Sequence, residues 1–524
     1  MKKYLLLLLA SALTASCVDR EPDELGKVDA YTVSHDMIVL GERLEDPYSV
    51  SNMTRALVNL YGTRASRIIV APSDVYVRFL PSTAEDLDIL RRKGLELTDH
   101  PLDYSILVDG DYYQDPEIPE DRITWQYAVV KPDFVFPDNI RYEVLDECFI
   151  PDDDSPTRSS DGFDWSAVEA ESFRLTGNGD LLETGTKAGS YGAPSGEIRI
   201  MDPGYNSGRS IGVAGVKVVA NTFVKFTSGY TDEEGHYQLK KKFSSRPRYR
   251  IVFHNQKGFG IGFNKILVQG SVSTLGKNPP EGVDVTIDAS SNRKLFTRCV
   301  VNNAAWDWFK LCSAEDCKIA APPLNLRFWL FQKLSASVSP MLQQGTLLNS
   351  GIVGKYIGEY VSLVKMFLPD IVLGLSGAAG YEEIYEAAIH QLCLSSLFMQ
   401  VGKDWWASLA MALMESFVSA GKESYGSGGQ DGAGYVEVAQ MWAFYMRNTV
   451  IRGRYGVSMP LEGTGWWFHP EIFHYMDERG LGPNELFRAL TSEVRDIEGL
   501  KASLSALYPE KRTMIMQAFE NYGK

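Results

Sequence analysis

The spacing of apolar residues changes near residue 280, and this change constrains the fold more than any other feature of the chain. Between residues 195 and 275, apolar and polar residues alternate with the period of two that is typical of half-buried β-strands. Further on, Leu486, Leu490 and Val494 recur at intervals of four, which places them on one helix face. We therefore expect a multi-domain α+β protein, and 524 residues are enough for roughly two to four domains.

The first folded segment, residues 33–150, is predicted to be a small α+β domain. Ser49 precedes an amphipathic stretch and is expected to cap a helix. The residues from Val75 to Leu80 predict a strand, and Ser82 is expected to cap a second helix with Glu85 in the capping-box position. This strand–helix–strand order is typical of a ferredoxin-like or propeptide-like module. Proline, serine and aspartate then dominate the composition, and we assign residues 151–190 to a linker.

Six acidic residues between Asp109 and Asp121 raise the question of a calcium site. Their spacing does not match an EF-hand loop, and the glutamate that closes such a loop is missing. We therefore expect a solvated loop at this place rather than a metal centre.

The beginning of the chain has the features of a bacterial export signal. Lys2 and Lys3 precede a short apolar run that ends in small residues, so residues 1–16 are predicted to be a signal peptide. Cys17 follows directly, and the segment resembles a lipobox, in which such a cysteine receives a diacylglyceryl group. The usual leucine lies one position early here, so a plain signal peptide with an incidental cysteine remains the alternative.

Residues 17–32 are predicted to be an acidic tether. The acidic stretch just after Cys17 resembles the surface-export signal of Bacteroidetes lipoproteins, and a solvated spacer is the alternative. The expected location is the outer membrane, with a lipid anchor at Cys17 and with exposure at the cell surface left open.

Residues 191–278 are predicted to form a β-sandwich. A G-V-x-V pattern begins at Gly215, and a T-D-x-x-G-x-Y-x-L pattern runs from Thr231 to Leu239. These patterns resemble the carboxypeptidase regulatory-like, transthyretin-like sandwich. The resemblance implies a structural or binding spacer, and the fold alone names no ligand.

Residues 279–524 are expected to contain a short sheet followed by a helical body, which is the order of a zinc metallopeptidase catalytic domain. The predicted helices lie near residues 381–401, 404–420, 435–450, 483–497 and 509–521. The segment from Tyr385 to Leu394 resembles the zinc helix of gluzincin-like metallopeptidases. The segment from Val438 to Tyr445 resembles their second, glutamate-bearing helix.

The resemblance also implies that this zinc site is degenerate. In an HExxH helix two histidines bind one zinc ion, and the glutamate polarises the zinc-bound water. His390 matches the first ligand, but Gln391 replaces the base, Leu394 the second histidine and Gln440 the carboxylate ligand. Glutamine cannot accept a proton near neutral pH, and leucine has no lone pair. We expect neither bound zinc nor catalysis; the alternative is an unrelated helical domain with a core histidine.

Composition narrows the function further. The net charge of −15 repels phosphate backbones, so no nucleic-acid partner is expected. Cys312 and Cys317 flank four residues, and an exported location permits a disulfide between them. Trp405 and Trp406 could form a sugar-stacking platform, but their apolar surroundings favour core packing.

These observations together predict a lipid-anchored envelope protein with a catalytically dead metallopeptidase-like domain. Its function is then binding or scaffolding of a polypeptide, a glycan or an envelope partner at the former active-site cleft. The first alternative is an active zinc metallopeptidase with an unconventional ligand set. The second is a purely structural surface lipoprotein whose cleft has closed.

Overall fold

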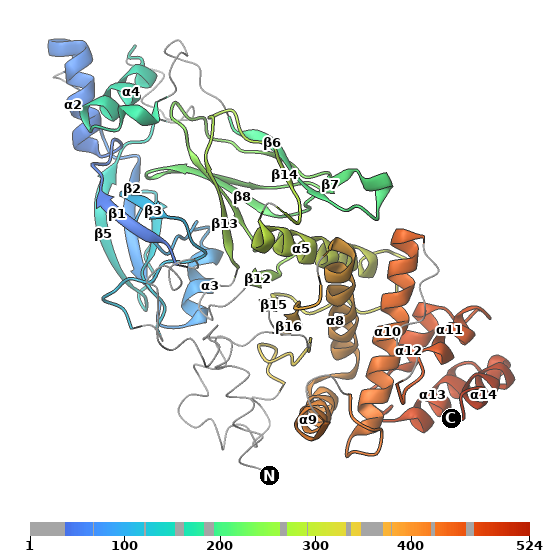
Figure 1. Cartoon of the computed structure of the whole chain (residues 1–524). Coiled ribbons are helices and arrows are strands. Elements are labelled where there is room, and N and C mark those ends of the chain that lie inside the picture. Colours follow the sequence, from blue (N-terminus) through green and yellow to red (C-terminus); the bar gives the residue numbers. More distant parts are fainter. Residues whose placement is uncertain are drawn as a thin grey trace, which may run out of the picture.

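The structure is a computed structural model of the whole chain (Figure 1). It is an α+β architecture with several small sheets and a mainly helical C-terminal region, as expected at this level from the sequence. The predicted signal peptide, Cys17 and the acidic tether lie outside the described residues. The residues that the structure describes are 37–65, 68–119, 122–151, 162–182, 193–262, 270–290, 292–331, 337–346, 370–378, 380–420, 425–456 and 466–524.

The N-terminal module is built around a three-stranded antiparallel sheet in which β2 (Asp74–Leu80) is central. β4 (Gln126–Val130) and β5 (Arg141–Cys148) pair with its two edges. β1 (Val39–Arg43) and β3 (Tyr104–Val108) form a separate antiparallel pair. A ferredoxin-like module has four strands, so the three strands of the described sheet do not have that arrangement.

Two helices of this module begin at capping residues. Helix α2 (Val50–Tyr61) begins after Ser49, whose hydroxyl oxygen accepts a hydrogen bond from the Asn52 N–H, as predicted. Helix α3 (Ala84–Arg92) begins one residue later than predicted. The reason is that Thr83, and not the preceding serine, forms a capping box with the aspartate of the first turn.

The predicted linker contains a packed helix, α4 (Trp165–Leu175). This helix lies against α2 in Figure 1, and both Trp165 and Phe173 are buried in the core of the N-terminal module. Its Glu169 forms a buried ion pair with Lys225 of the next module at 3.1 Å. Helix α4 is therefore part of the folded body, and the polar residues around it in the sequence concealed it.

The middle module has two four-stranded sheets. In one sheet β6 lies at the centre, and in the other the strand order is β13-β11-β8-β9. All pairs are antiparallel except β6 with β14, which is parallel. The first sheet consists of β10 (His236–Gln238), β6 (Ser195–Met201), β14 (Val285–Ile287) and β7 (Ser210–Gly212), and the second of β13 (Val272–Lys277), β11 (Arg248–Val252), β8 (Lys217–Thr222) and β9 (Lys225–Tyr230).

The second of these sheets has one apolar and one charged face. Val218 and Ile251 are fully buried in the apolar core that this sheet shares with the first sheet. Because side chains alternate along a strand, their neighbours Lys217 and Arg250 lie on the opposite face. That face is directed toward the N-terminal module, where both residues line a cavity.

The C-terminal region begins with a parallel sheet formed by β12 (Gly260–Gly262), β15 (Arg327–Phe331) and β16 (Ile371–Gly374). β12 comes from the segment that was assigned to the β-sandwich, and β14 lies beyond that segment. The expected boundary at residue 278 therefore does not separate the two sheets in the structure. Helix α5 (Arg293–Cys312) is buried along most of its length and packs against α8 (Tyr381–Val401).

The predicted helices are present in the predicted order, but α11 and most of α13 were not predicted, and one predicted helix is shorter than expected. α8 has the predicted bounds, while α9 and α10 extend beyond them. The predicted helix 483–497 ends early, at Ala489, and a separate helix begins after Asp496, whose side chain accepts a hydrogen bond from the Gly499 N–H. The bounds are α9 (Lys403–Ala420), α10 (Ala433–Tyr455), α11 (Glu471–Asp477), α12 (Pro483–Ala489), α13 (Ile497–Leu507) and α14 (Arg512–Glu520).

The middle module and the C-terminal helices share one continuous apolar core, from Ile198 in β6 through Val300 in α5 to Trp442 in α10. Packing of this extent makes α8 and α10 interior helices (Figure 1). Within the described ranges, none of the helices has both the length and the apolar character needed to span a bilayer.

Candidate functional site

Helix α8 carries three of the four positions at which the sequence predicts a degenerate zinc site. The helix begins after Gly380, whose N–H donates a hydrogen bond of 2.5 Å to the Glu383 carboxylate. His390, Gln391 and Leu394 are all buried, with exposed fractions of 5%, 4% and 3%. The three side chains therefore belong to the interior of the protein.

The structure brings His390 together with Gln440, which lies on the neighbouring helix α10. His390 Nε2 is 3.1 Å from Gln440 Oε1, so the imidazole N–H donates to the amide oxygen. The ring of Phe444, one turn further along α10, packs edge-on against the imidazole with 4.7 Å between centroids. The predicted first and third ligand positions thus meet across two helices.

The distance between these two atoms is close to the spacing of two ligands on one zinc ion. Zinc–nitrogen and zinc–oxygen bonds of about 2.1 Å at a tetrahedral angle place the ligand atoms about 3.4 Å apart. A direct hydrogen bond spans nearly the same distance here. The two side chains are therefore close enough to share an ion, as any hydrogen-bonded pair of side chains is.

The other two predicted positions have different surroundings. Gln391 Oε1 accepts a hydrogen bond of 2.8 Å from Ser339 Oγ, and the carbonyl oxygen of Ser339 accepts one of 2.9 Å from the Trp406 indole. Leu394 packs in the apolar core. The segment around Ser339 therefore covers the position where a zinc peptidase has its general base.

The surroundings of the pair, and not the protonation state of His390, argue against a bound metal, because a neutral imidazole is the form that binds zinc. Burial, together with the nearby guanidinium of Arg447, lowers the pKa of His390 to about 3, so the imidazole is neutral at pH 7. His390 Nδ1 is buried and has no hydrogen-bond partner among the residues described. A zinc-bound histidine normally donates its second N–H to a partner that orients the ring. That partner is missing here.

The acidic residues near the two helices are already paired with cations. Glu386 contacts Arg447 at 3.1 Å, and Glu437 contacts Lys524 at 2.7 Å. The side chain of Glu415, a further candidate in the sequence, lies outside the described residues. One imidazole, an amide and a nearby guanidinium do not form a zinc site, and the residues present therefore do not fit this metal.

The cysteines predicted to form a disulfide are both free thiols in the structure. Cys312 is the last residue of α5, and its Sγ lies 4.0 Å from Ser396 Oγ. Burial, together with a smaller effect of the neighbouring Cys317, raises the pKa of the Cys312 thiol to about 12. The disulfide between these cysteines stays a prediction.

The acidic stretch that begins at Asp109 is not simply the solvated loop that its composition predicts. Asp109 forms an ion pair with Arg248 at 2.5 Å, and Asp111 forms one with Arg298 at 2.7 Å. Arg248 lies in β11 and Arg298 in α5, so the two aspartates connect the N-terminal module to the rest of the protein. The partners are 139 and 187 residues away in sequence, which is why the spacing of the acids could not predict them.

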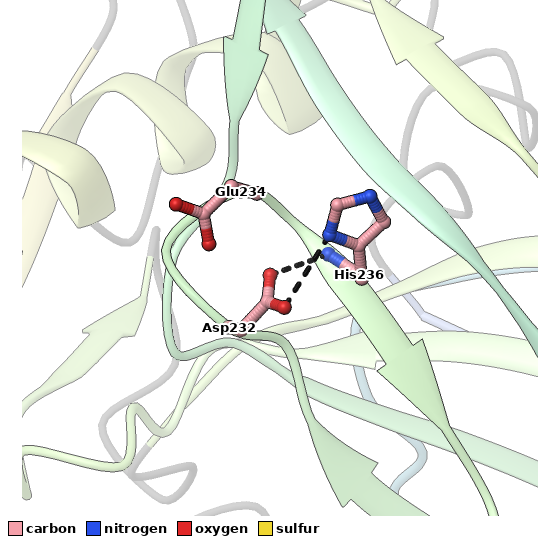
Figure 2. A group of neighbouring side chains, drawn as sticks. All are labelled: Asp232, Glu234 and His236. Atoms are coloured by element: carbon pink, nitrogen blue, oxygen red, sulfur yellow. Dashed lines mark hydrogen bonds and ion pairs between the residues drawn. The ribbon is translucent and has the colours of Figure 1, made fainter.

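A second cluster of potential ligands was not singled out in the sequence. Asp232, Glu234 and His236 have ligand atoms within 4.8 Å of one another (Figure 2), and alternate acidic residues before a histidine were the available signal. All three are exposed, and Asp232 already contacts His236 Nδ1 at 3.3 Å and accepts from the His236 N–H at 2.8 Å. These bonds form the turn that the T-D-x-x-G pattern predicts. The cluster is explained by that turn.

The tryptophans considered as a sugar platform belong to the core, as the sequence favours. Trp405 and Trp406 are 4% and 1% exposed. The Trp405 indole donates a hydrogen bond of 2.7 Å to the carbonyl oxygen of Val494. Neither ring offers a face to a ligand.

No family profile, curated protein or solved structure gives a significant match to this chain. Arguments about its function therefore depend on the geometry above and on the short sequence motifs.

Proposed function

We propose that the chain is a lipid-anchored envelope protein whose C-terminal region derives from a zinc metallopeptidase and no longer performs catalysis. The observation that supports this most directly is the hydrogen bond between His390 and Gln440, at 3.1 Å. It joins the two residues that the metallopeptidase resemblance assigns to the first and third ligand positions. A hydrogen bond of this kind supplies neither a Lewis acid nor an activated water.

The order of elements supports the same origin. Along the chain, the strands β12, β15 and β16 of the parallel sheet come before α8, and α10 comes after α8. This is the short sheet and helical body that the metallopeptidase resemblance implies. An unrelated helical domain would have no reason to place His390 against the residue at the third ligand position.

For the middle module, we propose a transthyretin-like sandwich. The G-V-x-V motif leads into β8, and the T-D-x-x-G motif forms the turn between β9 and β10. The two four-stranded sheets share apolar residues such as Ile198 and Val218 in one core. In such a fold the module acts as a spacer or as a binding surface, and it needs no catalytic group.

The role we assign to the whole protein is binding or scaffolding of a polypeptide, a glycan or an envelope partner. The degenerate positions are 5% exposed or less, and Ser339 covers Gln391. A partner therefore has no direct access to them, and we place the binding surface elsewhere on the molecule. The closed site also supports the structural alternative, in which the protein holds other envelope components without a specific ligand.

The first experiment measures zinc in the purified protein and in a variant with restored ligands, Gln391→Glu, Leu394→His and Gln440→Glu together. We expect no stoichiometric zinc and no peptide cleavage from the unmodified protein. The triple variant is expected to bind one zinc ion, because its two histidines and new carboxylate lie on facing helices. A matched control adds His390→Ala to the triple variant and should abolish this binding.

Circular dichroism shows whether each variant is folded. A folded triple variant that does not bind zinc would contradict the metallopeptidase origin. Stoichiometric zinc in the unmodified protein would contradict the loss of the metal site and favour an active peptidase with unconventional ligands. Activity of the triple variant is not required, since groups that position a substrate are separate from the metal ligands.

A further inference from the structure

A cavity of about 180 Å³ lies between the N-terminal module and the charged face of the β13-β11-β8-β9 sheet. On the sheet side it is lined by residues that alternate along the strands, such as Arg248, Arg250 and Val252 in β11. On the other side it is lined by residues between 87 and 126 of the N-terminal module. It is separate from His390 and Gln440, so its role does not depend on the metallopeptidase origin.

Two of the three cations on this sheet face have carboxylate partners across the cavity. Lys217 contacts Glu96 at 2.5 Å, and Arg248 contacts Asp109 at 2.5 Å. The charges of these two pairs cancel. The N-terminal module thus presents acids that match two of the basic residues of the sheet.

Arg250 is the third cation, and it has no carboxylate within ion-pair distance among the described residues. It is 7% exposed, and its Nη2 donates a hydrogen bond of 3.0 Å to Asn221 Oδ1. Its Nε is buried without a partner. Asp99 is the acid whose charge acts most strongly on Arg250, and it already accepts hydrogen bonds from the His100 ring at 3.1 Å and from the Tyr113 N–H at 2.6 Å.

A buried guanidinium without a counter-ion is costly for a protein. Burial lowers the pKa of Arg250 to about 10, which still leaves it fully charged at neutral pH. A buried charge is normally paired, because its loss of hydration is otherwise uncompensated. An anion in the cavity would supply the missing charge and accept the free N–H groups.

The size and lining of the cavity limit what this anion can be. A volume of about 180 Å³ has room for several water molecules or for one small organic anion. Leu97, Val219 and Phe226 contribute apolar surface beside Arg250. A fully hydrated inorganic ion gains nothing from these side chains, whereas a short apolar chain does.

We propose that this cavity binds a small organic carboxylate, with the carboxylate on Arg250 and the apolar part against Leu97, Val219 and Phe226. Arginine suits this role because its planar guanidinium donates two parallel hydrogen bonds to a carboxylate. The binding is reversible and involves no chemical step. It also gives the interface between the two modules a ligand-dependent stability.

The first test uses the unmodified protein and two probe pairs, butyrate with butyramide and benzoate with benzamide. Each amide has nearly the shape of its carboxylate but no charge. Isothermal titration calorimetry should show binding of at least one carboxylate and at least tenfold weaker binding of its amide. Inorganic phosphate serves as a third probe, because arginine also binds phosphate.

The second test uses Arg250→Met, with Arg199→Met as the matched control. Arg199 lies in β6 of the other sheet and does not line the cavity; its guanidinium donates to Ser210 at 2.9 Å. Arg250→Met should weaken carboxylate binding at least tenfold, and Arg199→Met should leave it unchanged. Without ligand, Arg250→Met should melt at the same temperature as the unmodified protein or higher, since it removes an unpaired buried charge.

Several results would overturn the proposal. They are equal binding of a carboxylate and its amide, no binding of any probe, and binding of phosphate alone. Unchanged carboxylate binding in a folded Arg250→Met variant would show that the anion lies elsewhere. The comparison of carboxylate and amide needs no variant, so the proposal can fail even if a variant does not fold.

Discussion

His390 on α8 and Gln440 on α10 are joined by a hydrogen bond of 3.1 Å in the interior of the helical region. The bond satisfies one buried nitrogen of the imidazole and leaves the other, Nδ1, without a partner in the described part of the chain. Under the proposed metallopeptidase origin, this hydrogen bond takes the place of the zinc ion that once joined the two helices.

The neutral state of His390 makes the stability of this region dependent on pH. The pKa of His390 is lowered from 6.5 in the unfolded chain to about 3, mainly by burial. Between about pH 3 and pH 6.5, His390 therefore binds a proton in the unfolded chain but not in the folded protein. The contribution of His390 to the free energy of unfolding is complete above pH 6.5. It falls by about 1.4 kcal/mol for each pH unit below 6.5.

A His390→Gln variant isolates this contribution. His254 and His474 also have a pKa lowered by burial, to about 4, and they remain in both proteins. The variant should be less stable than the unmodified protein at pH 7. The difference should narrow by about 2 kcal/mol at pH 5, because only the unmodified protein loses the His390 contribution. Urea unfolding followed by tryptophan fluorescence measures it, and an equal difference at both pH values would contradict a neutral buried imidazole.

The cysteine prediction concerns Cys312 and Cys317. If they form a disulfide in the exported protein, neither thiol reacts with iodoacetamide in denaturant until a reductant is added. The gain in stability should be about 2 kcal/mol at most, because the closed loop is short. Cys299 and Cys393 are buried free thiols and serve as controls that label under both conditions. Mass spectrometry of the peptides decides, and labelling of both cysteines without reductant would reject the disulfide.

The lipid anchor is tested on the membrane fraction of cells that express the full chain. We expect the mature N-terminus at Cys17, with a diacylglyceryl group on its sulfur, because small residues and a short apolar run precede it. A Cys17→Ser variant should move to the soluble fraction, and Cys148→Ser, a change at a buried thiol of the N-terminal module, is the control. A chain that starts elsewhere without lipid would contradict the prediction.

Local signals in the sequence were sufficient for several elements. The bounds predicted for α8 are those of the structure. Two glutamates in the first turn of this helix and Gly402 at its end are the local signals for these bounds. Ser49 likewise predicted the start of α2. Each of these depends on groups within about one turn of the chain, which is the range that capping and helix periodicity cover.

Other features depend on partners that lie far apart in the sequence. The pairing of Asp109 with Arg248 spans 139 residues, and β12 crosses to the C-terminal sheet although its sequence neighbours belong to the middle module. The predicted helix 483–497 failed for a different reason. Leu490 and Val494 are buried, so the apolar pattern continues through this segment. The helical conformation, however, ends at Ala489 and begins again after Asp496.

The candidate site shows the same division. The resemblance of two short segments predicted that His390 and Gln440 would face each other, and they do. It did not predict that Ser339 would cover Gln391, because that contact joins α8 to a loop 52 residues earlier in the chain. No signal in the sequence predicted the cavity at Arg250. The charge of Arg250 is unusual only because the neighbouring cations of the sheet have carboxylate partners and Arg250 has none in the described part of the chain.

The last prediction concerns the buried ion pair between Lys225 in β9 and Glu169 in α4. Both side chains are 1% exposed, and their charged atoms are 3.1 Å apart. The Tyr48 hydroxyl donates a hydrogen bond of 2.6 Å to the same carboxylate oxygen. The pair therefore fixes a helix of the predicted linker to the middle module.

Lys225→Met keeps the length of the side chain but leaves the Glu169 carboxylate buried without its cation. This variant should lose about 3–5 kcal/mol of unfolding free energy, and Glu169→Gln should lose a similar amount by stranding the ammonium group. The double variant should be more stable than the sum of the two losses implies, by at least 1–2 kcal/mol on the same scale. Urea unfolding of the four proteins gives this coupling energy. Losses below about 1 kcal/mol, or losses that simply add, would mean that the pair is solvated and that α4 is not docked as the structure has it.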